Sequence, residues 1–130
     1  MSNMKPRPAV VSQQHDWCVL IVEDEYFLAD DLARGFADKG ISILGPVPSI
    51  DQAMAIVERQ KVNLAVLDIA LDDSKVYDVA DALIAQDVPV LFVTGYDRDA
   101  IPDRYADVPM CQKPASAKDV IIALERIVAR

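Results

Sequence analysis

The chain has 130 residues, enough for one domain with a substantial buried core but not comfortably for two. Its 13 Lys and Arg residues stand against 21 Asp and Glu residues, and the resulting formal charge of −8 opposes binding to nucleic acid and to anionic membranes. No apolar run is long enough to span a bilayer and the N-terminus lacks the apolar part of a secretory signal, so we expect a soluble, cytoplasmic protein.

The first 15 residues are predicted to form a flexible tail, followed by one domain over residues 16–130. Pro6 and Pro8 discourage regular structure in this tail. His15, the only histidine, lies at its end and is interpreted as a solvated side chain, not as a metal ligand or phosphoryl carrier.

Five short apolar runs alternate with segments of helical spacing along the rest of the chain. The runs have the length of strands buried on both faces; they are Cys18–Val22, Ile41–Leu44, Leu64–Leu67, Val90–Val93 and Val108–Cys111. Apolar residues at helical spacing follow four of them, at Leu28–Phe36, Ala53–Val57, Val76–Ile84 and Val120–Val128. Between the last two runs, Pro102 and few apolar residues predict a short or irregular segment.

Local signals mark the ends of these predicted helices. Gly40 is expected to close the first helix. Ser49 with Gln52, and Ser116 with Asp119, have the spacing of capping boxes at the starts of the second and last helices.

This alternation of strands and helices favours a parallel sheet with right-handed crossovers and helices on both faces. We therefore predict an α/β domain with a flavodoxin-like, doubly wound, five-stranded parallel sheet in the order 2-1-3-4-5. Such sheets bind ligands at the carboxyl ends of their strands, where the strand order reverses. The residues that end each strand are therefore the candidates for chemistry.

Three carboxylates are expected to meet at that edge of the sheet. Glu23 and Asp24 follow the first run and Asp68 follows the third, and these two strands are neighbours in the predicted order. Such crowding raises at least one carboxyl pKa unless a cation is present, and a ligand set made only of oxygen indicates Mg²⁺. One carboxylate can then attack a phosphoryl group, and Asp68 is the best candidate.

Two further polar residues stand at strand ends. Lys113 follows the fifth run and could place its ammonium on a phosphoryl oxygen, while the Thr94 hydroxyl at the end of the fourth could donate to another. The Lys113–Pro114 bond can be cis or trans, and a cis bond could turn the lysine inward.

The stretches VLIVEDE, AVLDIAL, FVTGYD and QKP, in this order and spacing, resemble the receiver domain of two-component response regulators over about residues 17–130. The resemblance implies that Asp68 accepts a phosphoryl group from a histidine kinase or a histidine phosphotransfer protein. It implies that Glu23, Asp24 and Asp68 hold Mg²⁺ together with the backbone carbonyl of Ala70. Thr94 would be the switch hydroxyl and Lys113 the lysine that contacts phosphate.

One position departs from the pattern of this family in a way that affects signalling. Met110, three residues before Lys113, replaces the Tyr or Phe that turns inward upon phosphorylation, and we interpret it as a core residue. Some receivers without that aromatic carry a Phe-x-Thr-Gly motif with a nearby Tyr. The stretch FVTGY is similar, so Tyr96 is our candidate for reporting the phosphoryl state.

Several acids near the site are interpreted as solvated surface residues. Asp72 and Asp73 lie in the loop after Asp68, which lacks the glycine common in this family. Glu25, Asp30 and Asp31 are assigned to the exposed face of the first helix.

Two other functions are alternatives to that of a phosphoacceptor. A phosphohydrolase that works through an aspartyl intermediate generally needs an acid two residues beyond the nucleophile, and Ala70 cannot protonate a leaving group. We therefore expect no multiple-turnover enzyme, only autodephosphorylation. A degenerate receiver, a binding module that is not phosphorylated, is disfavoured by the complete acidic set with Thr94 and Lys113.

The mode of signalling follows from the end of the sequence. Arg130 comes shortly after the last predicted helix, so we expect a standalone receiver without an output domain. Such a protein would signal through protein–protein contacts on the side of the short fourth helix, the fifth strand and the last helix. We expect it to be a monomer when unphosphorylated.

Overall fold

A computed structural model describes residues 13–69 and 75–130 of the chain. Its strands are β1 (Cys18–Val22), β2 (Ser42–Val47), β3 (Leu64–Asp68), β4 (Val90–Thr94) and β5 (Met110–Gln112). Its α-helices are α1 (Tyr26–Asp38), α2 (Ile50–Arg59), α3 (Val76–Ala85) and α4 (Ala117–Val128). Three short 3-10 helices complete it: η1 (Gln14–Asp16), η2 (Arg98–Ala100) and η3 (Asp103–Tyr105).

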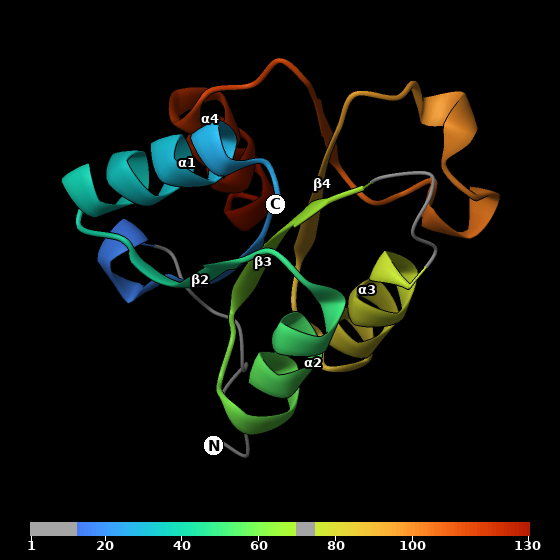
Figure 1. Ribbon diagram of the computed structural model, residues 1–130, viewed down its shortest axis with the longest axis horizontal. Helices are drawn as coiled ribbons and strands as arrows, with labels where there is room; N and C mark the ends of the chain where they lie inside the picture. Colours follow the sequence, from blue (N-terminus) through green and yellow to red (C-terminus); the bar gives the residue numbers. More distant parts are fainter. Residues whose placement is uncertain (1–12, 70–74) are drawn as a thin grey trace.

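The five strands form one parallel sheet in the order β2-β1-β3-β4-β5, as predicted (Figure 1). β1 pairs with both β2 and β3, so the strand order reverses beside β1. The predicted flavodoxin-like fold is therefore confirmed. It places the carboxyl ends of β1, β3 and β4 side by side, where this fold class binds its ligands.

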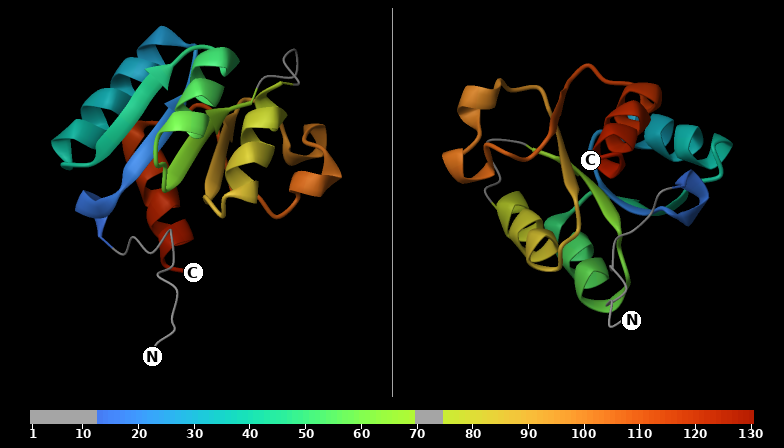
Figure 2. Two further views of the ribbon diagram at one scale, coloured as in Figure 1. Left: turned by 90° about the horizontal axis from the view of Figure 1, so that it is seen from below. Right: turned by 180° about the vertical axis from the view of Figure 1, so that it is seen from behind.

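Helices cover both faces of the sheet, as Figure 2 shows from two sides. Alternate residues of β1 point to opposite faces: Val19 and Ile21 pack with α1 and α4, whereas Leu20 and Val22 pack with α2 and α3. Burial on both faces explains why the strands are continuous apolar runs. Each fully buried Leu or Phe in these two layers contributes about 1.5–3 kcal/mol of hydrophobic stabilisation.

Two of the predicted helix signals are confirmed by hydrogen bonds. Gly40 follows α1 with a φ of 71°, and its N–H donates to the Ala37 carbonyl while the Ile41 N–H donates to the Phe36 carbonyl. Ser116 and Asp119 form the complete capping box of α4. At α2 only half of the capping box forms. The Ser49 hydroxyl accepts from the Gln52 N–H at 3.2 Å, but it also donates to the Gln52 side-chain oxygen, which in a full box would accept from the Ser49 N–H.

The predicted end of the second strand was wrong. The sequence predicts that the second strand ends at Gly45–Pro46, yet β2 continues through it to Val47. The pairing with β1 shifts register at this point, and Gly45 has a φ of 99°, where a Cβ atom would lie 2.8 Å from the Ile21 carbonyl oxygen. β2 is an edge strand, so a glycine bulge followed by a proline is tolerated there. The fifth strand also lies slightly later than predicted, at Met110–Gln112.

The segment between β4 and β5 is irregular, as the sequence predicted. It contains only η2 and η3, and Pro102 is the residue before η3. The Arg98 guanidinium donates to the carbonyls of Tyr105 and Val108 at 3.2 and 2.8 Å, and the Tyr105 hydroxyl donates to Asp81 of α3 at 2.6 Å. These bonds hold the segment without a regular helix.

The predicted N-terminal tail lies largely outside the described residues. Its last residues, Gln14 and His15, belong to η1, and the Gln14 amide donates to the Glu125 carboxylate at 2.7 Å. The described part of the chain contains no helix long and apolar enough to cross a membrane.

Candidate functional site

The acidic residues predicted at the strand ends do converge. Glu23 and Asp24 directly follow β1, Asp68 ends β3, and the register of these two neighbouring strands pairs Val22 with Leu67. One carboxylate oxygen from each acid lies within 4.8 Å of the others. The three acids line a small cavity of about 70 Å³, which is room for an ion and a few waters.

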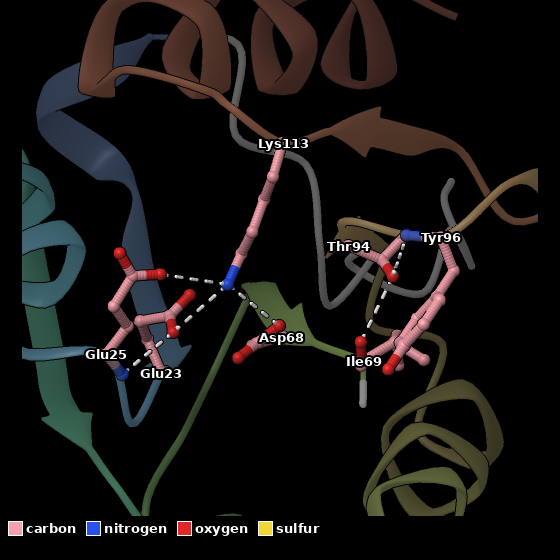
Figure 3. Close-up of polar contacts among 7 residues, drawn as sticks. All are labelled: Glu23, Glu25, Asp68, Ile69, Thr94, Tyr96 and Lys113. Carbon is pink, nitrogen blue, oxygen red and sulfur yellow. Dashed lines mark hydrogen bonds and ion pairs between the residues drawn. The ribbon is translucent and has the colours of Figure 1, made fainter. Parts of the chain in front are cut away.

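Lys113 reaches into this group from the end of β5 (Figure 3). Its Nζ lies 3.2 Å from Asp68 Oδ1, 3.5 Å from Glu23 Oε2 and 3.4 Å from Glu25 Oε2. Its backbone N–H donates to the Thr94 carbonyl at 2.7 Å, which ties it to β4, and the Lys113–Pro114 bond is cis. One ammonium group therefore faces three carboxylates.

The electrostatics of the site reflect this excess of negative charge. Burial first, and then the hydrogen bond to Asp68 and the charge of Asp68, raise the pKa of Glu23 to about 7, although the Glu25 N–H donates to Glu23 and Lys113 lies close. Burial also raises the pKa of Asp68, against the lowering effects of Glu23 and Lys113. Burial alone would lower the pKa of Lys113, but the carboxylates outweigh it and raise that pKa.

The donor set fits a hard divalent cation. All three ligands are carboxylate oxygens, which Mg²⁺ prefers, and a cation would relieve the repulsion that raises two of the carboxyl pKa values. Glu23 is almost fully buried, Asp68 is half-buried and Asp24 is exposed, so the cluster opens to solvent on the side of Asp24. The predicted carbonyl ligand from Ala70, and the loop acids Asp72 and Asp73, lie outside the described residues.

Thr94 is fully buried at the end of β4, and its hydroxyl is engaged with backbone groups. It donates to the Ile69 carbonyl at 3.1 Å and accepts from the Tyr96 N–H at 3.0 Å (Figure 3). A hydroxyl has a single proton to donate. Donation to a phosphoryl oxygen would therefore require Thr94 to give up the Ile69 carbonyl.

Tyr96 lies two residues beyond Thr94 and is 39% exposed. Its link to the site is the hydrogen bond from its backbone N–H to the Thr94 hydroxyl. Met110, which replaces the usual aromatic residue, is partly buried against the core, as predicted.

The structure adds two contacts that sequence reasoning missed. Glu25 was assigned to the exposed face of a helix, and its side chain is 58% exposed, yet it pairs with Lys113. Asp31 is also exposed but accepts from the Ala117 N–H at 2.9 Å, where it caps α4. Both contacts join residues more than 80 positions apart, so no local pattern marks them. The one local signal for the Glu25–Lys113 contact is that Glu25 directly follows the acidic pair Glu23–Asp24.

Known proteins resemble this chain in sequence and in fold. The family model described as the response regulator receiver domain matches residues 19–124. The transcriptional regulatory protein PdtaR of Mycobacterium tuberculosis is 28% identical over 116 residues, covering 86% of this chain and 57% of that protein. The sensory transduction protein RegX3 of Mycolicibacterium smegmatis is 34% identical over 120 residues, covering 86% and 50%.

This chain thus spans about half the length of these two relatives. One protein of known structure is closer to this chain in length. The solution structure of SdrG from Sphingomonas melonis Fr1 has 32% sequence identity and a TM-score of 0.75, and the match covers 91% of this chain and 100% of SdrG.

Proposed function

This chain belongs to the family of response regulator receiver domains, and from this premise we propose that Asp68 accepts a phosphoryl group in a Mg²⁺-dependent reaction. The donor is a histidine kinase or a histidine phosphotransfer protein, and the signal passes on through protein–protein contacts. The observation that supports this proposal best is the meeting of Glu23, Asp24 and Asp68 with the Lys113 ammonium 3.2 Å from Asp68.

Each side chain has a role in the proposed reaction. An oxygen of Asp68 attacks the phosphorus atom; the new O–P bond forms as the P–N bond to the donor imidazole breaks, and the imidazole nitrogen keeps the electron pair. The Lys113 ammonium, which forms an ion pair with Asp68, can move to a phosphoryl oxygen. Its ion pairs with Glu23 and Glu25 keep it close to the site. Glu23 and Asp24 would hold Mg²⁺ beside Asp68. The bound ion would neutralise charge as phosphoryl group and carboxylate approach each other.

The conformational signal is proposed to start at Thr94. If its hydroxyl turns to the phosphoryl group, it leaves the Ile69 carbonyl, and the hydrogen bond that it accepts from the Tyr96 N–H is rearranged. Tyr96, one of the few large apolar side chains exposed in the described residues, would then present a different surface to a partner. Loss of phosphorylation-dependent partner binding in Tyr96→Ala is the expected result. Unchanged binding in this variant would remove Tyr96 from the proposal.

Mass spectrometry of the intact protein tests the phosphoacceptor. The chain is incubated with Mg²⁺ and a small phosphodonor such as acetyl phosphate, and Asp68→Asn is compared with Asp38→Asn, an exposed acid at the far end of α1. We expect one lasting phosphoryl adduct in the wild type and in Asp38→Asn but none in Asp68→Asn. Rapid multiple turnover of the donor would instead indicate a phosphohydrolase. A wild type without any adduct would indicate a binding module that is not phosphorylated.

A further inference from the structure

A groove of about 330 Å³ lies beside the acidic site, between α1 and the end of β2. Its apolar lining comes from small and rigid residues: Ala29 and Ala33, one helical turn apart on α1, Pro46 in β2 and Pro48 just after it. β2 is an edge strand, so no further strand within residues 13–69 and 75–130 covers this side of the sheet. The apolar lining could therefore receive the hydrocarbon part of a partner's side chain.

An exposed aromatic ring also lines this groove. Tyr26, the first residue of α1, lines the groove and is 73% exposed. Its ring is braced by Phe27 in an edge-to-face arrangement, with the ring centroids 5.4 Å apart. Large exposed aromatic residues next to a concave surface are typical of interaction sites. The electron-rich face of such a ring also attracts cations.

The charged groups along the groove are all acidic. Glu23, Asp24 and Asp30 line it, but Glu23 is almost fully buried and paired with Lys113, so Asp24 and Asp30 are the acids open to a partner. Among the described lining residues there is neither Lys nor Arg. Asp30 forms an ion pair with Arg34 one turn later, at 2.9 Å, but that arginine is 78% exposed, and exposed pairs of this kind contribute little. A cationic group from outside could therefore share or take over the Asp30 carboxylate.

We propose that this groove binds an arginine side chain of a partner protein. The hydrocarbon stem would lie along Ala29, Ala33 and the prolines. The guanidinium would lie between the Tyr26 ring and the carboxylates of Asp24 and Asp30. Arginine fits better than lysine, because its planar and weakly hydrated head group stacks on aromatic rings and bonds carboxylates in pairs. The net charge of −8 also steers cationic partners towards the molecule.

This surface goes beyond the proposed phosphorylation chemistry, because the transfer of a phosphoryl group to Asp68 does not require the groove to be filled. Asp24 nevertheless lines both the groove and the acidic cavity. The binding test is therefore made with Mg²⁺ present, the condition in which Asp24 is least available to an arginine.

The binding test is an NMR titration of the full ¹⁵N-labelled chain with acetyl-Leu-Arg-Leu-amide. The control peptide carries citrulline, which has nearly the shape of arginine without its charge. We expect the arginine peptide to shift the amide signals of Ala29 and Ala33 in a saturable way, and to bind at least about fivefold more tightly than the citrulline peptide. Equal affinity of the two peptides, or unshifted Ala29 and Ala33 signals, would overturn the proposal.

Matched variants locate the binding surface. Ala33→Lys places a positive charge in the groove and should weaken binding of the arginine peptide about tenfold. Ala37→Lys, one turn further along the exposed side of α1, should change the affinity less than about twofold. Tyr26→Leu should weaken binding more than Phe27→Leu, because Tyr26 lines this groove and Phe27 does not. Equal effects within either pair would refute the placement.

Phosphorylation is measured separately in the same variants. Ala33→Lys should still take up a phosphoryl group from the small phosphodonor, which also shows that it is folded. If neither the wild type nor any variant is phosphorylated but the arginine peptide still binds, the proposed phosphoacceptor function is refuted. The proposed arginine site is not refuted by that result.

Discussion

The buried carboxyl group of Glu23 makes the stability of the metal-free protein depend on pH. Its side chain is 2% exposed and its pKa is raised to about 7 from an ordinary 4.5. Between these two values the folded state keeps a proton that the unfolded state has lost. The free energy of unfolding therefore falls as pH rises through this window and levels off above about pH 7.

The substitution Glu23→Gln should remove most of this dependence. The full difference in pKa corresponds to about 3 kcal/mol. Part of the slope remains in the variant, because burial also raises the pKa of Asp68. The amide oxygen of Gln can still accept from the Glu25 N–H, and Lys113 keeps its pairs with Asp68 and Glu25. We therefore expect Glu23→Gln to be more stable than the wild type by about 2 kcal/mol near pH 8 in EDTA.

Urea unfolding followed by circular dichroism, from about pH 4.5 to about pH 8 and with EDTA, measures this difference. Glu58→Gln is the matched control, since Glu58 lies exposed on α2. Added Mg²⁺ should reverse the order, because the wild type gains binding energy that the variant largely lacks. Parallel pH curves for wild type and Glu23→Gln, or a variant that is less stable in EDTA near pH 8, would refute the reasoning.

Two further predictions concern packing and the buried hydroxyl. Gly35→Ala should destabilise the protein by about 1–3 kcal/mol in spite of its better helix propensity, because the added methyl group would overlap the side chain of Ala117. Urea unfolding measures the loss, and addition of Ala117→Gly should recover part of it; a stabilised single variant would contradict the close approach of α1 and α4. Thr94→Val should cost about 1–3 kcal/mol, since it leaves the Ile69 carbonyl and the Tyr96 N–H without this partner, whereas Thr94→Ser should cost less. A loss in Thr94→Ser as large as or larger than that in Thr94→Val would refute the prediction, because Thr94→Ser keeps the hydroxyl and removes only the methyl group.

Much of the candidate site could be predicted because its residues stand at the ends of apolar runs. Glu23 with Asp24, Asp68, Thr94 and Lys113 each mark the end of a different strand, and parallel strands with short crossovers bring those ends to one edge. The prediction needed only local patterns and one topological rule. The same reasoning located the end of α1 at Gly40, since a helix end depends on a few adjacent residues.

Contacts between distant residues could not be predicted in this way. The sequence does not show that Glu25 shares Lys113, or that the Thr94 hydroxyl is committed to the Ile69 carbonyl. The path of β2 through Gly45–Pro46 depends on the pairing of that segment with β1, which overrides the local turn signal.

The sequence by itself determined the sheet, its helices and the set of acids at its edge, because strand and helix periodicity are properties of neighbouring residues. Only the tertiary structure decided how the charges divide among Lys113 and its carboxylates, and that Ala29 and Ala33 face Pro46 and Pro48 across a groove. Side chains far apart in the chain become neighbours only when the core packs. Burial and mutual distance, which the linear sequence does not contain, then set their pKa values and their partners.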